Sequence, residues 1–233
     1  MVFSILQDKK LQTIVYIDGY NLYYGALKHS QYKWLDIYKL FAEHICPSIY
    51  GKKSHVQIKF FTADILGSVS PSPDSPKDQR TYHNALLKLY PEQIHIIKGS
   101  YSKEVITAKL MQDIPHYTKD RVKVLKLEEK QTDVNIALEM YRDVAKGICK
   151  QVILCSNDTD LIPALSALSD DFPHINKGVV FPILEGSKRA FSKKFKEYCN
   201  WTWKHLSIND LRYSQLPHTI KTAKKPILKP DTW

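Results

Sequence analysis

Short apolar segments alternate with helix-patterned segments along most of this chain. The apolar segments are rich in β-branched residues, which favours buried strands; they are residues 13–17, 56–63, 93–97, 151–155 and 178–184. Apolar side chains recur at helical spacing in four other segments, residues 35–45, 77–90, 132–147 and 161–168. Strands that alternate with helices form right-handed crossovers. The pattern therefore predicts an α/β fold with a central parallel β-sheet flanked by helices on both faces.

The remaining segments indicate one domain followed by a tail. Residues 122–127 alternate between polar and apolar side chains, as a half-exposed strand does. Pro47 is expected to end the helix over residues 35–45. Residues 12–212 are predicted to form the domain. Residues 213–233 are predicted to be a basic, flexible tail, because lysines and prolines dominate them.

Composition excludes several classes of protein. Hydrophobic residues make up 43% and charged residues 25% of the chain, which excludes wholesale disorder. No apolar run approaches the ~20 residues of a membrane span, and the first residues do not resemble a signal peptide. The four cysteines form no C-x-x-C pair, which argues against a zinc site or a disulfide framework. We expect a cytoplasmic protein with no membrane partner.

The net charge of the chain is +10, from 34 Lys and Arg against 24 Asp and Glu. Such an excess favours a polyanionic partner, and nucleic acid before a membrane surface. Solubility alone is the alternative explanation of the charge.

Acidic residues stand where the predicted strands end. Asp18 follows the strand over residues 13–17, and Asp158 and Asp160 follow the strand over residues 151–155. Asp133 lies in the first turn of a predicted helix. Ligands of parallel α/β sheets bind beyond the carboxyl ends of the strands, so these side chains are expected to meet there. Four carboxylates repel one another unless a cation intervenes, and oxygen ligands suit Mg²⁺ or Mn²⁺.

Each of these aspartates also has a purely structural explanation. Asp18-Gly19 is a common turn dipeptide. Asp133 is well placed to interact with a helix dipole. For Asp158 or Asp160, the structural explanation is a cap on the helix that begins near Leu161.

Three motifs in order resemble the NYN family of PIN-like, FEN-like ribonuclease domains, in its bacterial branch. They are Y-I-D-G-Y-N-L-Y-Y-G at residues 16–25, E-K-Q-T-D-V at residues 129–134 and S-N-D-T-D-L at residues 156–161. Residues 80–99 are also similar to that branch, and the resemblance covers residues 12–206. The second motif departs from the common E-K-G-V-D at Gln131 and Thr132, and neither change removes a carboxylate.

The resemblance implies a Rossmann-like PIN fold with an acidic metal site. Carried over to this sequence, the metal ligands are Asp18, Asp133, Asp158 and Asp160, which also count as catalytic residues. Asn21 is the motif asparagine, expected to hold the loop of Asp18 or a metal-bound water in place. With Mg²⁺ or Mn²⁺, such a site hydrolyses phosphodiester bonds. The expected function is a metal-dependent nuclease, and the family makes RNA the first choice of substrate.

Further residues are candidates for binding the substrate. Lys130 lies close to Asp133 and is placed to contact the scissile phosphate, although a solvated surface lysine is the alternative. Arg80 and His83 open the helix after the Ser/Pro loop and are candidates for the substrate backbone. Tyr23 is a candidate for stacking on a base, and packing against the sheet is its alternative role.

Two other functions remain open from the sequence. One is a catalytically silent nucleic-acid-binding module that keeps the fold. The other is a small-molecule enzyme, since relatives with the D-G-Y-N-L-Y-Y-G form are described as hydroxylases of a succinoylpyridine. The chain contains no G-x-G-x-x-G segment of the dinucleotide-binding type. The sequence sets no oligomeric state and does not choose between endo- and exonucleolytic cleavage or between one and two metal ions.

Overall fold

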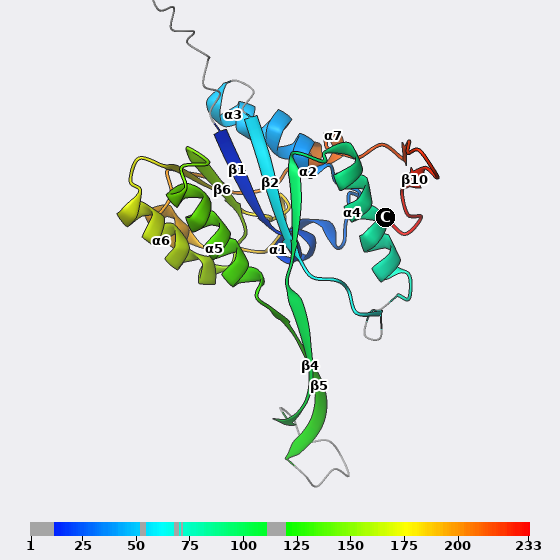
Figure 1. Ribbon diagram of the computed structural model, residues 1–233. Coiled ribbons are helices and arrows are strands. Elements are labelled where there is room, and N and C mark those ends of the chain that lie inside the picture. Colours follow the sequence, from blue (N-terminus) through cyan, green and yellow to red (C-terminus); the bar gives the residue numbers. More distant parts are fainter. Residues whose placement is uncertain (1–11, 52–54, 68–69, 71, 111–119) are drawn as a thin grey trace, which may run out of the picture.

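A parallel sheet forms the centre of the computed structural model, which describes residues 12–51, 55–67, 70, 72–110 and 120–233. The sheet has six strands in the order β3-β2-β1-β6-β7-β8, and each neighbouring pair is parallel. Figure 1 shows β1, β2 and β6 side by side at its centre. Its strands are β1 (Gln12–Asp18), β2 (His55–Thr62), β3 (Ile94–Lys98), β6 (Gln151–Cys155), β7 (Asn176–Val180) and β8 (Trp201–Trp203). The predicted parallel α/β sheet is confirmed.

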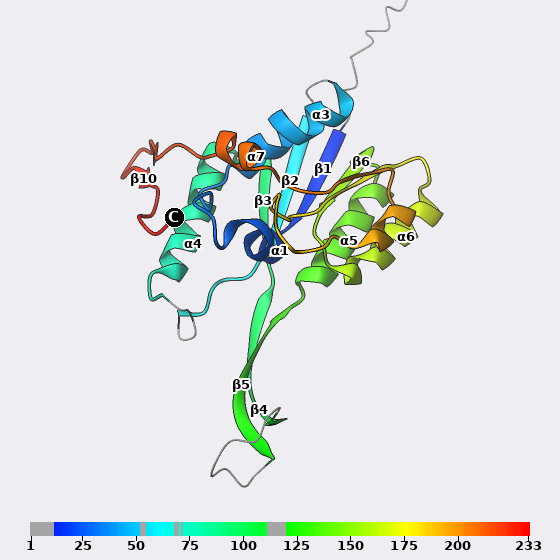
Figure 2. The ribbon, with the colours of Figure 1, turned by 180° about the vertical axis from the view of Figure 1, so that it is seen from behind.

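Helices cover both faces of this sheet, as predicted. The helical segments are α1 (Gly19–Leu22), η1 (Tyr23–Leu27), α2 (Ile37–Lys39), η2 (Leu40–Ile45), α3 (Cys46–Tyr50), α4 (Ser75–Leu89), α5 (Thr132–Ala145), η4 (Thr159–Leu161), α6 (Ile162–Asp171), η5 (Lys193–Glu197) and α7 (Ile208–Tyr213). Alternate residues of β1 point to opposite faces, and this divides the core in two. Val15 and Ile17 pack with η2, α4 and α7, whereas Ile14 and Tyr16 pack with α5 and α6. Figure 2 shows α5 and α6 together on one side of the sheet and α4 on the other.

The helix after Leu35 differs from the prediction at its end. Pro47 was expected to stop it, but helical backbone continues through α2, η2 and α3 to Tyr50. Proline is tolerated here because it occupies the first turn of α3, directly after the wider turns of η2, where no α-helical hydrogen bond is required of it. The helix ends instead at Gly51, whose φ of 68° places it in the left-handed region that glycine adopts without strain.

A long two-stranded ribbon projects from the sheet. It consists of β4 (Ser100–Lys109) and β5 (Arg121–Lys130), which pair antiparallel over their full length. Both views show it extending away from the body of the molecule (Figures 1 and 2). The strand predicted over residues 122–127 is therefore present as part of β5, and its partner β4 was not predicted.

Residues 213–233, predicted from sequence to be a basic tail, include two short strands. They are β9 (Thr219–Ile220) and β10 (Ile227–Leu228), which pair antiparallel. At the far end Trp233 lies against the core, with its ring centroid 5.3 Å from that of Tyr82 and 6.3 Å from that of Trp34. The hydroxyl of Thr232 donates a hydrogen bond to Asp78 Oδ2 at 2.5 Å.

Candidate functional site

The strand order places β1 and β6 at the point where the chain changes direction across the sheet. From β1 the chain moves to β2 and β3 on one side, and from β6 it moves to β7 and β8 on the other. Ligands of open α/β sheets bind beyond the carboxyl ends of the strands at such a switch point. Asp18 is the last residue of β1, and Ser156 directly follows β6. The predicted acidic residues therefore lie at the position that the fold favours for a site.

Asp18 is held by hydrogen bonds from two segments of the chain. Its carboxylate accepts the backbone N–H of Asn21 at 2.9 Å, which caps α1, and the hydroxyl of Ser156 at 3.0 Å. Asp18 is only 4% exposed. Burial raises the pKa of Asp18 despite these hydrogen bonds, which act in the opposite direction.

Ser156 links Asp18 to the second acidic segment. Its oxygen accepts the backbone N–H of Asp158 at 3.0 Å while its hydroxyl donates to Asp18. The carboxylate of Asp158 accepts the backbone N–H of Asp160 at 3.1 Å and so caps η4. A capping role for Asp158, one of the alternatives from sequence, is thus present in the structure. Asp160 is exposed.

Asp133 belongs to a third acidic segment, which lies near Asp18 and Asp158. It lies in the first turn of α5 and is half-buried. Burial and the charges of three neighbouring carboxylates raise the pKa of Asp133 to about 6; the three neighbours are Asp18, Asp158 and Asp160. The structure therefore brings together the four carboxylates that the sequence singled out.

Glu129 is a fifth carboxylate that sequence reasoning did not select. It lies near the end of β5, half-buried, and accepts a hydrogen bond from the hydroxyl of Thr132. Burial raises the pKa of Glu129, and the charges of Asp18 and Asp133 raise it further. Its position at the start of the E-K-Q-T-D-V motif was the available signal.

Asn21 connects the two loops beside the carboxylates. Its side-chain oxygen accepts the backbone N–H of Asn157 at 3.3 Å and the guanidinium of Arg189 at 3.2 Å. Asn157 in turn holds the chain near Arg189, since it donates to the carbonyl of Ala190 and accepts the N–H of Ser192. Arg189 is exposed and was not predicted as a site residue, because it lies in a loop without a recognisable pattern.

The predicted substrate-binding residues lie in three different environments. Lys130 is exposed and forms an ion pair with Glu128 on the ribbon. Arg80 is exposed on α4, whereas His83 of the same helix is buried and lines a cavity. Tyr23 is half-buried and lines that cavity too.

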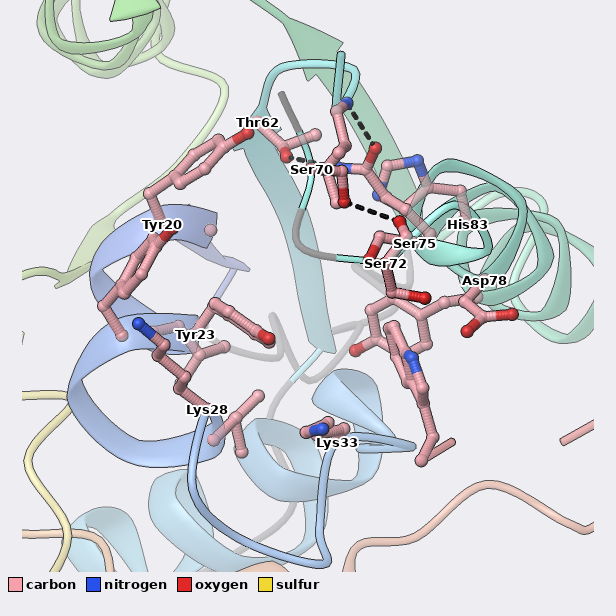
Figure 3. Close-up of a pocket in the computed structure, with 18 of the residues that line it drawn as sticks. Tyr20, Tyr23, Lys28, Lys33, Thr62, Ser70, Ser72, Ser75, Asp78 and His83 are labelled. Atoms are coloured by element: carbon pink, nitrogen blue, oxygen red, sulfur yellow. Dashed lines mark hydrogen bonds between the residues drawn. The ribbon is translucent and has the colours of Figure 1, made fainter. Parts of the chain in front are cut away.

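This cavity has a volume of about 600 Å³ and lies beside the carboxylates. Gly19 and Tyr20, which directly follow Asp18, form part of its wall. Figure 3 shows Tyr20 and Tyr23 on one side, from α1 and η1, with Asp78 and His83 of α4 opposite. Its lining is rich in aromatic side chains, namely Tyr20, Tyr23, Tyr24, Phe60, Tyr82, Tyr101 and Trp233. Sequence reasoning did not predict a cavity of this kind.

The donor set suits a hard divalent cation, although no ready-made ligand cage is present. Among the described residues, no group of three His, Cys, Asp or Glu side chains is arranged to hold a metal ion. The carboxylates nonetheless carry only oxygen donors, and repulsion between their charges adds to the burial that raises the pKa values of Asp133 and Glu129. A divalent cation among them would relieve that repulsion.

Comparison with known proteins identifies the family. The family model described as "NYN domain" matches residues 12–200. The chain belongs to the NYN domain family. This confirms the predicted resemblance and places the chain among nuclease-type domains of the PIN-like superfamily, which generally use divalent metals. The six-stranded parallel sheet with its flanking helices is consistent with a PIN-like fold.

Two further similarities extend over nearly the whole NYN chain. It is 36% identical over 244 residues to "6-hydroxy-3-succinoylpyridine 3-monooxygenase HspA" of Pseudomonas putida (strain DSM 28022 / S16), covering 98% of this chain and 77% of that protein. A solved structure of a protein of unknown function from Vibrio parahaemolyticus RIMD 2210633 superposes with a TM-score of 0.50 at 16% identity, covering 88% and 96% of the two chains. The second similarity concerns the fold alone.

Among the described residues, no helix of this NYN protein has the length and hydropathy needed to cross a bilayer. The cytoplasmic location expected from the sequence stays a prediction.

Proposed function

We propose that this NYN protein is a metal-dependent phosphodiesterase that cleaves nucleic acid, with RNA as the first choice of substrate. One observation carries the proposal. Carboxylates from three separate segments lie at the switch point of the sheet, where the hydroxyl of Ser156 ties Asp18 to the loop of Asp158, and the charges of Asp18 and Asp158 add to the burial that raises the pKa of Asp133. Membership of a nuclease-type family supports the same assignment.

The residues around the carboxylates would have different roles in the proposed reaction. Asp18, Asp133 and Asp158 would hold Mg²⁺ or Mn²⁺, with Glu129 and Asp160 beside them. When bound, such a cation supplies the Lewis acid that activates water and stabilises the leaving oxygen. Asn21 keeps the loops after β1 and β6 in register through its bonds to Asn157 and Arg189. The exposed guanidinium of Arg189 is placed to bind a phosphate of the substrate.

A segregation of charge on the ribbon supports a nucleic-acid substrate. Alternate residues of a strand lie on one face, so the face that carries Tyr101 and Glu129 near the carboxylates continues outward along the ribbon. Four cations lie on that face, namely Lys103, Lys109, Arg121 and Lys123. On the opposite face, Lys126 and Lys130 form ion pairs with Glu128. The basic face is thus suited to the phosphate backbone of a strand that reaches the carboxylates.

The basic face gives a prediction about salt dependence. Changing Lys103, Lys109 and Lys123 together to Gln should weaken RNA binding and flatten its dependence on salt. The loss in log–log slope is expected to be about two units, at ~0.7 per phosphate contact on a single strand. Fluorescence anisotropy with labelled RNA in EDTA, between low and moderate salt, measures it.

The matched control removes the same charge elsewhere. Changing Lys88, Lys126 and Lys146 to Gln takes away three lysines that lie outside the basic face and should leave the slope close to that of the wild type. Equal losses in the two triple variants would show that net charge, and not this face, binds the nucleic acid.

A second function is supported by the similarity to the Pseudomonas monooxygenase. That relative is 36% identical over nearly the whole chain, and its name describes oxidation of a hydroxylated succinoylpyridine. The aromatic cavity beside Asp18 has the size of a small-molecule site. Oxidation of a pyridine acid is therefore the alternative function of this chain.

One experiment separates the two functions. The purified chain is incubated with labelled RNA and Mn²⁺, and in parallel with 6-hydroxy-3-succinoylpyridine, NADH and air. The proposed function predicts cleavage that EDTA abolishes, and no NADH consumption above the control without substrate. Substrate-dependent NADH consumption without RNA cleavage would replace the nuclease by the alternative.

A further inference from the structure

The cavity beside the carboxylates has the dimensions of a ligand site. Its volume of about 600 Å³ falls within the range of roughly 300–1,000 Å³ that is usual for small-molecule pockets. It lies between α1–η1 and α4, past the carboxyl end of β2, where Thr62 forms part of the wall (Figure 3). The space is therefore large enough for a single nucleotide or a metabolite of similar size.

Aromatic rings form much of the wall. Tyr20 and Tyr23 face the cavity from one side, and Phe60, Tyr82 and Trp233 also line it. The rings of Tyr82 and Trp233 are 5.3 Å apart and inclined at 46°. Flat aromatic side chains of this kind stack on planar ligand rings, and the stacking tolerates different substituents on the ligand ring. The wall is thus suited to a planar ring.

His83 provides a polar contact in this apolar setting. It is 6% exposed and lies at the cavity wall, with its ring centroid 6.0 Å from that of Phe60. Burial lowers the pKa of His83 to about 4, so the imidazole is neutral at pH 7 and has one donor and one acceptor nitrogen. No hydrogen bond to these nitrogens is made within the described parts of the chain. By contrast, the amide of Gln79 is bonded to the backbone at Ala63 and Ile65.

Two lysines add positive charge to the same cavity. The ammonium of Lys28 lies 4.8 Å from the ring centroid of Tyr24, and that of Lys33 lies 3.4 Å from the carbonyl oxygen of Thr232. Neither ammonium has a carboxylate partner within the described residues. An anionic group on a ligand would supply that partner.

We propose that this cavity binds a planar nitrogen heterocycle that carries an anionic group. The ring packs between the aromatic walls, a polar atom of its edge bonds to His83, and the anion pairs with Lys28 and Lys33. Two sources have this chemistry. One is a nucleotide of the nucleic-acid substrate, which rests on the proposed function and would lie beside the scissile bond, because Gly19 and Tyr20 directly follow Asp18. The other is a free heterocyclic acid.

Calorimetric titration of the whole chain in EDTA tests the proposal without any requirement for cleavage. The probes are uridine 5′-monophosphate, 3-succinoylpyridine and 4-oxo-4-phenylbutanoate, which replaces the pyridine of 3-succinoylpyridine by benzene. We expect one of the two heterocycles to bind, and Lys33→Gln to weaken it by at least about tenfold, since a charged hydrogen bond is lost. His83→Phe keeps a ring at this position and should reduce the preference for the heterocycle over its benzene counterpart. Lys88→Gln, an exposed change on α4 outside the cavity, should leave binding unchanged.

The outcomes separate the sources and the two proposals. Binding of the nucleotide alone identifies the nucleic-acid source, and binding of the pyridine acid alone identifies the metabolite source. No binding of either heterocycle, or equal binding to the wild type and the Lys33→Gln variant, overturns the proposal about the cavity. RNA cleavage is measured on the same purified protein after EDTA is replaced by Mn²⁺. A chain that binds a ring but does not cleave RNA with Mn²⁺ contradicts the proposed function and leaves the cavity proposal standing.

Discussion

Replacing Asp18 by Asn is expected to lower Mn²⁺-dependent RNA cleavage by more than about 100-fold while the chain stays folded. Changes to residues that merely support a metal site cost about 10–100-fold, and a direct ligand should cost more. Stability should hold because Asn is as good a helix cap as Asp and keeps an oxygen for the N–H of Asn21. Single-turnover cleavage of labelled RNA, together with a melting curve, measures both effects.

Asp36→Asn is the matched control for this change. Asp36 is 3% exposed and caps α2 through the N–H of Lys39, so it resembles Asp18 in burial and in local role. It lies outside the carboxylate cluster, and its Asn variant should cleave RNA at close to the wild-type rate. If the Asp18 and Asp36 variants lose activity equally, or neither does, the role assigned to Asp18 is wrong.

The carboxylate cluster should also make stability depend on pH in a definite direction. The pKa of Asp133 is raised from 3.8 to about 6 in the folded chain, first by burial and then by its acidic neighbours. Between about pH 4 and pH 6 the folded state therefore holds a proton that the unfolded state has released, and stability falls as pH rises through this range. The shift corresponds to about 3 kcal/mol, which solvent screening of this half-buried group reduces to about 1 kcal/mol.

Asp133→Asn isolates this contribution. In EDTA, its melting temperature relative to that of the wild type should rise by about 2–4 °C between pH 4.5 and pH 7.5, because only the wild type acquires the repelling charge. Asp170→Asn, an exposed change on α6, should show no such rise. A difference between Asp133→Asn and wild type that is constant with pH would mean that Asp133 serves only the helix dipole.

Binding of Mn²⁺ should offset the loss of stability that the charged Asp133 causes in the wild type. A cation that binds only the folded chain stabilises it by about 2.7 kcal/mol at a hundredfold excess over its dissociation constant. The Asp133→Asn variant, which lacks one of the charges, should gain less at pH 7.5. The same melting curves, repeated with Mn²⁺ in place of EDTA, provide the comparison.

The parallel sheet was predictable because its strands are short and apolar on both faces. Residues 13–17 and 151–155 show this pattern directly, and the structure buries them completely in β1 and β6. The ribbon was harder to predict, because β4 has few apolar residues and gains its partners from β5 rather than from a core. The prediction that Pro47 ends a helix was wrong because the effect of a proline on helical backbone depends on the turns that precede it.

The candidate site, like the fold, could be predicted only in part from the sequence. Asp18 could be selected because it ends a buried strand, Asp158 because it lies just beyond one, and Asp133 because it lies in the first turn of a helix. Arg189 was missed since its contact with Asn21 joins distant segments, and Glu129 was missed since its proximity to Asp18 arises only in the folded chain. The cavity could not be derived either. It joins residues from η1, β2, α4 and the end of the chain, and a single tryptophan at position 233 carries no periodic signal.

Anomalous diffraction from crystals soaked in Mn²⁺ is the decisive test of a metal site among the carboxylates, because it locates the ion without reference to activity. An anomalous peak should appear among the carboxylates of Asp18, Asp133 and Asp158, and it should be lost in the Asp18→Asn variant. A fully occupied peak elsewhere on the chain, or no peak among these carboxylates at millimolar Mn²⁺, would contradict it.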